Sequence, residues 1–287
     1  MNESKRNDSN ARGTAAWDLS GSYSFRGQQI SYGRMGEGRP MILLHGTPFS
    51  SIVWHRIAPY LSSQREVFYF DLLGYGKSEM REDADVSLGV QNELFAALLD
   101  EWKIDQPDVV AHDFGATTAL RTHILNGRDY RSLTLIDPVA LSPSGSPFVQ
   151  YARPREKALA ELPAYIHEAI LRAYIAKAVS RTLSEEEMLL YLVPWLGPVG
   201  QAAFYRQIAQ MSDRYTDEIE NRYGEIRCPV SILWGEKDEW ISCERGYSLA
   251  ERMPGASLHL IPYASHLVQE DAPEAIVSTV LNFIQEP

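Results

Sequence analysis

Four short polar stretches of the sequence carry side chains that can attack an atom or move a proton, and each follows an apolar run. They are HGTP at 45–48, HDFGA at 112–116, GEKD at 235–238 and ASHLVQED at 264–271. Asp113 and Asp238 offer carboxylates and His266 offers an imidazole, the groups used in nucleophilic and acid–base catalysis. Parallel strands end at one edge of a sheet, where open α/β folds bind ligands. We therefore expect the four stretches to form one site.

The elements that must position these residues alternate along the chain. Continuous apolar runs separated by helical patterns indicate a parallel sheet that is buried on both faces. The first two runs flank a glycine turn and are expected to form an antiparallel hairpin. The predicted strands are 20–26, 28–34, 41–45, 66–71, 107–112, 132–137, 229–234 and 257–262, and the predicted helices are 50–62, 88–103, 115–126 and 243–253.

Residues 138–212 interrupt this alternation. The segment opens with PVALSPSGSPF and then becomes helical and rich in tyrosine. A helical insert between two strands of a parallel sheet usually lies over the ligand-binding edge, where it can cover a site. We therefore predict a core of residues 18–137 and 213–287, a helical cap over 138–212, and a disordered tail over 1–17.

Composition excludes several classes of function. The 287-residue chain has a formal net charge of −11, which argues against a nucleic-acid partner. It has no apolar run of about 18 residues that would span a membrane and no secretory signal. The two cysteines, Cys228 and Cys243, suit a reducing compartment. We expect a cytoplasmic protein without cofactor, metal or membrane contact that acts on a small molecule, with a homodimer left open.

In residue type and chain order, the polar stretches resemble the α/β-hydrolase superfamily, whose nucleophile, acid and histidine follow one another in this sequence. The segment DLLGYGKS at 71–78 is similar to the D-x-x-G-x-G-x-S segment of that superfamily. The resemblance covers roughly residues 18–287. It implies an α/β-hydrolase fold, with a mostly parallel eight-stranded sheet, helices on both faces and a helical cap inserted after the sixth strand.

The nucleophile elbow of the superfamily normally reads G-x-S-x-G, whereas this chain reads A-H-D-F-G at 111–115. The His-Asp pair resembles the aspartate-nucleophile branch, which contains epoxide hydrolases and dehalogenases. A serine that attacked a saturated carbon would give an ether, which is a dead end, whereas an aspartate gives an ester that water can hydrolyse. Asp113 therefore predicts displacement at a saturated carbon that bears a halide or an epoxide oxygen.

The same resemblance implies roles for further residues. His266 would be the base that activates water against the ester, and Asp238 would orient it, with Asp137 as the alternative acid. The backbone amides of Thr47 and Phe114 would form the oxyanion hole. His112 is interpreted as structural support.

The leaving group separates the subfamilies. Haloalkane dehalogenases carry a tryptophan beside the nucleophile and often an asparagine in HGNP, where this chain has Phe114 and Thr47. Trp195 in the insert is another source of an indole N–H. Fluoroacetate dehalogenases resemble H-D-R-G-x-R, with two arginines that clamp a carboxylate, where this chain has Phe114 and Thr117. Both dehalogenase types are therefore less favoured.

An epoxide oxygen leaves as an alkoxide that needs a proton, and epoxide hydrolases supply it from cap tyrosines. AFYRQI at 203–208 resembles the N-W-Y-R segment of that family, so Tyr205 is the candidate donor; Tyr151 and Tyr165 are candidates for the other cap tyrosine. We favour epoxide hydrolysis of a neutral, apolar substrate. Hydrolytic dehalogenation is the alternative, and a ligand-binding homologue without turnover is the alternative from another class.

Overall fold

The computed structural model describes residues 17–285. The predicted tail over 1–17 thus lies outside the described residues except for Trp17. The ring of Trp17 packs on Tyr69, with the ring centroids 4.0 Å apart, and its indole Nε1–H donates to the Ser51 hydroxyl at 3.0 Å. The first described residue is therefore already part of the packed core.

One eight-stranded sheet forms the centre of the protein, as predicted. Its strands lie in the order β1-β2-β4-β3-β5-β6-β7-β8. The pairs β1–β2 and β2–β4 are antiparallel, and all the others are parallel. Every residue of β5 and β6 is buried, because helices cover both faces of a parallel sheet. The strands are β1 (Gly21–Phe25), β2 (Gln28–Met35), β3 (Pro40–Leu44), β4 (Glu66–Phe70), β5 (Asp108–His112), β6 (Ser132–Ile136), β7 (Val230–Gly235) and β8 (Ser257–Ile261).

The helices of the sheet region depart from the prediction at the segment 50–62 and at four helices that were not predicted, α9, η4, α11 and α12. The predicted helix over 50–62 is a 3-10 turn followed by a short α-helix, because Pro59 has no N–H to continue a helical ladder. A C-terminal helix, α12, begins at Pro273 and was not predicted. The helices of this region are η1 (Ser51–Trp54), α1 (Ala58–Leu61), α2 (Leu88–Trp102), α3 (Phe114–Asn126), α9 (Arg214–Asp217), η4 (Glu220–Glu225), α10 (Glu244–Arg252), α11 (Val268–Asp271) and α12 (Pro273–Phe283).

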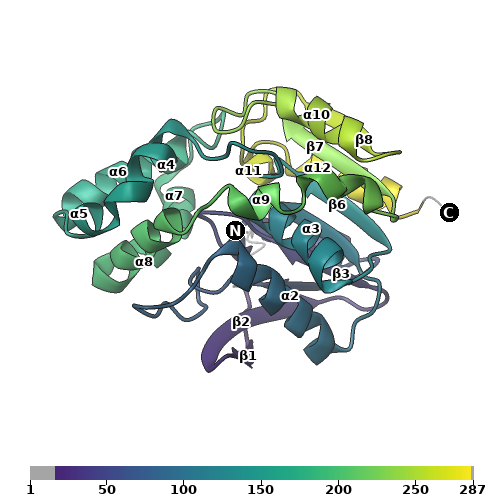
Figure 1. Ribbon diagram of the computed structural model, residues 1–287, viewed down its shortest axis with the longest axis horizontal. Coiled ribbons are helices and arrows are strands. Elements are labelled where there is room, and N and C mark those ends of the chain that lie inside the picture. Colours follow the sequence, from purple (N-terminus) through teal and green to yellow (C-terminus); the bar gives the residue numbers. More distant parts are fainter. Residues whose placement is uncertain (1–16, 286–287) are drawn as a thin grey trace, which may run out of the picture.

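The chain between β6 and β7 contains a second group of helices, which lies to one side of the sheet at the left of Figure 1. We call this group the cap; its domain boundaries, 138–212, stay a prediction. None of the described helices is long and apolar enough to cross a bilayer. The cap helices are α4 (Pro147–Ala152), η2 (Arg153–Arg155), α5 (Glu156–Ala160), α6 (Ala164–Ala176), α7 (Glu185–Leu192), η3 (Val193–Trp195) and α8 (Gly197–Ala209).

Candidate active site

Asp113 occupies a sharp turn between β5 and α3. Its backbone adopts φ 51° and ψ −117°, a strained conformation for a residue with a side chain. Two glycines make room for the turn. A Cβ on Gly115 would lie 2.5 Å from the His45 carbonyl oxygen, and one on Gly46 would lie 2.3 Å from the Asp113 carboxylate. The turn thus presents a carboxylate that is only 3% exposed at the carboxyl edge of the sheet.

The Asp113 carboxylate is bound differently at its two oxygens. The backbone amide of Thr47 donates to Oδ1 at 2.7 Å, whereas Oδ2 faces His266 Nε2 at 3.5 Å. Phe114 is the first residue of α3, so its amide has no partner within the helix. No hydrogen bond from this amide to the Asp113 side chain occurs within residues 17–285. Oδ1 is therefore the oxygen that the backbone holds, whereas Oδ2 faces the imidazole of His266.

His266 lies between two carboxylates and is fully buried. Its Nδ1 is 2.8 Å from Asp238 Oδ2, and Asp238 Oδ1 accepts the amides of Trp240 and Ile241 at 2.7 and 2.9 Å. Burial disfavours the charged imidazolium and so lowers the pKa of His266, but Asp238 and Asp113 outweigh burial and raise this pKa well above its usual 6.5. The two nitrogens of the ring thus face the predicted nucleophile and the predicted acid.

Asp137, the alternative acid, lies close behind this pair. Its Oδ1 accepts the amide of Gly235 at 2.9 Å, and Oδ2 is buried without a partner among the described residues. Burial, followed by the charge of Asp238, raises the pKa of Asp137 well above its usual value and so favours the neutral form of this carboxyl. A neutral acid stabilises an imidazolium less than a carboxylate does. The 2.8 Å contact of Nδ1 with Asp238 and the raised pKa of Asp137 both favour Asp238 as the partner of His266.

The same three side chains are the one group in residues 17–285 whose donor atoms converge as metal ligands would. Ligand atoms of Asp137, Asp238 and His266 lie within 4.8 Å of one another. His266 donates its Nδ1 proton to Asp238 in the pairing above, and a protonated nitrogen has no lone pair for a metal. An acid–base pair therefore explains this cluster without an ion.

A small cavity of about 20 Å³ opens beside Asp113. A space of this size holds little more than one water molecule, so a substrate requires movement of the residues around it. A second cavity of about 80 Å³ shares part of its wall and is lined on its far side by Ser242 and Arg245. No lysine or arginine lines the first cavity among the described residues. Its lining consists of Thr47, Asp113, Phe114, Val139, Ser144, Gly145, Ser146, Val149, Tyr174, Met211, Trp240 and Ile241.

Tyr174 of α6 is the cap tyrosine that lines this cavity, and sequence reasoning did not single it out. Its ring stacks on Trp240, with centroids 4.2 Å apart and planes 8° from parallel. Burial raises its pKa, and the nearby Asp113 and Asp238 raise the pKa further, so the phenol keeps its proton. A helical periodicity cannot show which of several tyrosines faces a cavity formed with another part of the chain.

The structure places the other aromatic candidates elsewhere. The Tyr205 hydroxyl lies 3.0 Å from His167 Nδ1 inside the cap, and Tyr205 does not line the cavity. Burial raises the pKa of Tyr205 to about 12. Tyr151 and Tyr165 are 58% and 74% exposed. The Trp195 indole donates to the Pro48 carbonyl at 2.6 Å, so this N–H already has a partner and is not free to bind a halide.

Gln207 of α8 is a further residue near the site that sequence reasoning missed. Its Oε1 accepts the hydroxyls of Thr47 and Tyr75 at 2.6 and 3.0 Å. Its Nε2 is buried and has no partner among the described residues. Because the amide of Thr47 holds Asp113, Gln207 connects a cap helix to the predicted oxyanion donor.

Two buried histidines support the site in the neutral form. His112 lies 3.0 Å from the His266 carbonyl through Nε2, and burial, together with the charge of His266, lowers its pKa to about 3. His45 accepts the amide of Leu72 at Nε2 at 2.8 Å, which requires the proton on Nδ1, next to the carbonyl of Gly46 at 3.0 Å. Burial lowers the pKa of His45 as well.

Comparisons with known proteins agree with this architecture. A model of the Alpha/beta hydrolase family matches residues 41–279 and includes all four polar stretches. A solved alpha/beta hydrolase fold protein from Burkholderia ambifaria is 55% identical, with a TM-score of 0.91 over 92% of this chain and 98% of that chain. A 2-hydroxymuconate semialdehyde hydrolase from Pseudomonas putida is 28% identical over 88% of this chain and 89% of its own length. The probable lysophospholipase BODYGUARD 2 from Arabidopsis thaliana is 27% identical over 79% of this chain, which spans about half (54%) of that relative.

Proposed function

Because this chain belongs to the Alpha/beta hydrolase family, we propose that it is a hydrolase that opens epoxides through an alkyl ester on Asp113. The observation that carries the proposal is the carboxylate itself, which stands on the elbow turn between the Thr47 amide and the imidazole of His266. The acyl transfer that a serine nucleophile performs is not expected here, because the residue at the elbow position is an aspartate. An acid in this place gives a hydrolysable product when it attacks a saturated carbon.

The first step joins Asp113 to the substrate. Oδ2 attacks a ring carbon of the epoxide, the carbon–oxygen bond breaks, and its electron pair stays on the oxygen. Tyr174, whose ring lines the cavity, donates its proton to this alkoxide. The transfer is downhill even from a phenol of raised pKa, because an alkoxide is about as basic as hydroxide, whose conjugate acid has a pKa near 15.7.

The second step releases the product. Esterification removes the negative charge of Asp113, one of the charges that raise the pKa of His266. His266 can then release its proton, and the Tyr174 phenolate regains one, so that the proton count is unchanged. Neutral His266 accepts a proton from water, which attacks the ester carbonyl carbon, and the Thr47 amide stabilises the developing charge on Oδ1. Collapse of the intermediate breaks the ester bond to the alkyl oxygen, and the remaining proton of the attacking water passes to this oxygen, which gives a diol and restores the carboxylate.

Replacing the base tests the whole scheme. We expect His266→Gln to form the ester and fail to hydrolyse it, so that intact mass and peptide mapping detect an adduct on Asp113. An epoxide adds its entire mass, whereas a haloalkane adds only its alkyl group and releases halide. The double variant Asp113→Asn/His266→Gln is the control and should remain unmodified. If neither class of compound modifies His266→Gln, the proposal is wrong.

Hydrolytic dehalogenation is the second candidate because Gln207 offers a buried amide N–H without a partner among the described residues. A leaving halide needs such donors but no proton. Tyr174, a proton donor that lines the cavity, supports epoxide opening over dehalogenation. The absence of a basic residue from the described lining weighs against a haloacid, which would need a counter-charge.

Two other activities are less well supported. The Pseudomonas putida relative is a semialdehyde hydrolase, but attack by aspartate on an acyl carbon would give a high-energy anhydride. A binding protein without turnover would not need a histidine held between two carboxylates. Tight binding of an epoxide by the unmodified protein, with no diol and no adduct in His266→Gln, would instead favour the binding protein.

A further inference from the structure

The cap segment between α6 and α7 lies against the loop that carries His266. The amide of Leu267, the residue after the histidine, donates to the Ala178 carbonyl at 2.7 Å. On the other side of the histidine, the amide of Ser265 donates to Asp271 Oδ2 at 2.8 Å. The same carboxylate oxygen accepts the amide of Ser180 from the cap, also at 2.8 Å. Both neighbours of His266 are therefore connected to the cap segment, one directly and one through Asp271.

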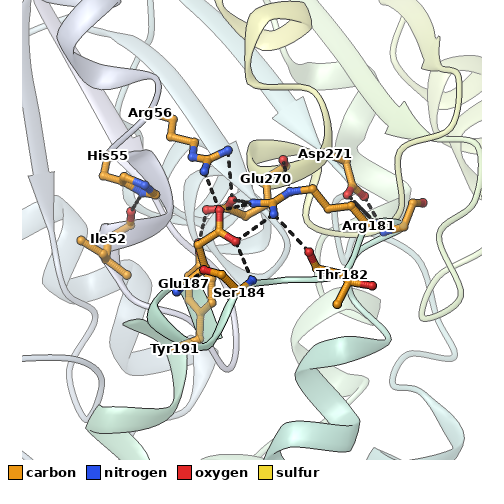
Figure 2. A network of polar contacts seen from close by, with 11 residues as sticks. Ile52, His55, Arg56, Arg181, Thr182, Ser184, Glu187, Tyr191, Glu270 and Asp271 are labelled. Atoms are coloured by element: carbon orange, nitrogen blue, oxygen red, sulfur yellow. Dashed lines mark hydrogen bonds and ion pairs between the residues drawn. The ribbon is translucent and has the colours of Figure 1, made fainter. Parts of the chain in front are cut away.

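A cluster of charges fastens the same two segments, as Figure 2 shows. Arg181 of the cap segment donates from Nε to the Glu270 carbonyl at 3.1 Å, and its guanidinium pairs with the Glu270 carboxylate. Arg181 also binds Glu187 of α7 at 2.8 and 2.9 Å. Arg56 of the core reaches both acids, at 2.7 Å to Glu187 and 3.5 Å to Glu270. The Tyr191 hydroxyl of α7 completes the cluster by donating to Glu270.

The cluster behaves as a unit because one of its charges is inaccessible to water. The Glu270 side chain is 0% exposed, so its charge depends on Arg181, Arg56 and Tyr191. Removal of one partner from a buried charge is costly, because the charge is then left without compensation. Movement of the cap segment away from Glu270 is costly for the same reason.

Helix α11, which carries Glu270 and Asp271, is too short to fix its own position. Helix α11 is a single turn, Val268–Asp271, that begins two residues after His266. One turn is too short to be stable in isolation, because the cost of helix nucleation is not recovered. Tertiary contacts must therefore set where α11 lies, and with it the direction of the His266 ring.

We propose that Arg181 and Asp271 are positioning residues, through which the cap segment at 178–181 holds His266 in line between Asp238 and Asp113. On this account the cap is part of the scaffold of the base as well as a cover for the site. This side of the cap stays attached during turnover, and movement that admits substrate occurs elsewhere in it. The turnover part of this proposal rests on the proposed ester mechanism.

Arg181→Met tests the proposal, with Arg172→Met as a matched control. Both arginines bind two glutamates and have side chains that are 33% exposed, but Arg172 binds Glu168 and Glu185 within the cap. In a single turnover, we expect Arg181→Met to form the Asp113 adduct at a near-normal rate and to hydrolyse it about 10- to 100-fold more slowly, as a base displaced by roughly 1 Å would. Arg172→Met should match the natural protein in both steps.

A second variant and a second measurement make the outcome independent of the folding of Arg181→Met and of the ester mechanism. Asp271→Asn keeps the shape of the side chain but turns an N–H₂ toward an amide donor, Ser180 or Ser265. NMR titration of His266 should show its pKa fall in both variants, because the ring moves away from its carboxylates. Unchanged titration and unchanged adduct hydrolysis in Asp271→Asn would overturn the positioning role, and so would equal slowing in Arg172→Met. If no compound forms an adduct even in His266→Gln, the mechanism fails, and the titration alone decides on the positioning role.

Discussion

The hydroxyl that serves the first step must be both acidic enough to donate and prevented from ionising early. Burial and the neighbouring carboxylates raise the pKa of Tyr174 and keep it protonated. A phenol of raised pKa can still donate, because the alkoxide is the stronger base. Its ring is fixed by stacking on Trp240, whose amide is in turn bound by Asp238. The proposed proton donor and the proposed acid thus both contact Trp240. Tyr174 should therefore matter for epoxide opening and for no later step.

Tyr174→Phe tests this assignment at the level of a single oxygen atom. We expect adduct formation from epoxides to slow by about 10²- to 10⁴-fold, the usual contribution of a general acid, while adduct formation from haloalkanes is unaffected. Rapid-quench mass spectrometry measures both rates. Tyr151→Phe, at a cap tyrosine that is 58% exposed, is the control and should leave both rates unchanged. The ring is unchanged in this variant, so equal slowing with both classes of compound would show that the hydroxyl does not act as a proton donor to the epoxide oxygen.

The sequence indicated some residues of the candidate site and not others for a physical reason. Asp113 and His266 stand at or just beyond the ends of strands, so the order of strands alone brings them together. Tyr174 and Gln207 come from the cap, where the packing of several short helices decides which side chain points inward. A pattern of residues along one helix does not contain that information.

Two nearby residues of helix α8 point in nearly opposite directions from the helix axis. Tyr205 and Gln207 are two positions apart, which is a rotation of about 200° around the helix axis. Gln207 faces the core and binds the Thr47 hydroxyl, so Tyr205 faces the cap interior and His167. The motif-like segment AFYRQI is therefore connected to the site through its glutamine rather than through its tyrosine.

Gln207→Met should separate the stability that α8 provides from its contribution to catalysis. The change keeps the length of the side chain and removes the acceptor of Thr47 and Tyr75, which costs about 1–3 kcal/mol of unfolding free energy. We also expect ester hydrolysis to slow by about 10-fold, part of the 10²-fold or greater effect of losing one oxyanion donor.

Gln201→Met on the same helix removes bonds to the carbonyls of Ala160 and Leu162, away from the site. It should lower stability similarly and leave hydrolysis intact, as urea unfolding and single-turnover kinetics would measure; equal rates in the two variants would contradict this role.

Across the whole molecule, a mostly parallel eight-stranded sheet was predictable because most of the apolar runs are continuous, as in strands buried on both faces, and the first two form a lead-in hairpin. The eight strands and their mostly parallel arrangement follow from that pattern. The contacts between cap and sheet do not, since they join residues far apart in sequence. Arg181 and Glu270 are 89 positions apart, and Thr47 and Gln207 are 160 apart. Long-range polar pairs of this kind cannot be predicted from the pattern of residues along a single segment.

Buried neutral histidines should make the folded protein sensitive to mild acid. Burial lowers the pKa of His112 to about 3, so below about pH 6.5 the unfolded chain binds a proton there that the folded protein does not, and stability falls as the pH falls. His45 acts in the same direction. His266, with a raised pKa, opposes this trend near and above pH 6.5, where the unfolded chain loses its proton, and adds little slope below about pH 6. The expected slope from His112 is about 1.4 kcal/mol per pH unit between about pH 6 and pH 5.

Urea unfolding of His112→Gln, which keeps an amide donor, should show a slope smaller by this amount, while His259→Gln, at an exposed histidine, should show the natural slope. Identical slopes in the natural protein and His112→Gln would mean that His112 is not neutral in the fold.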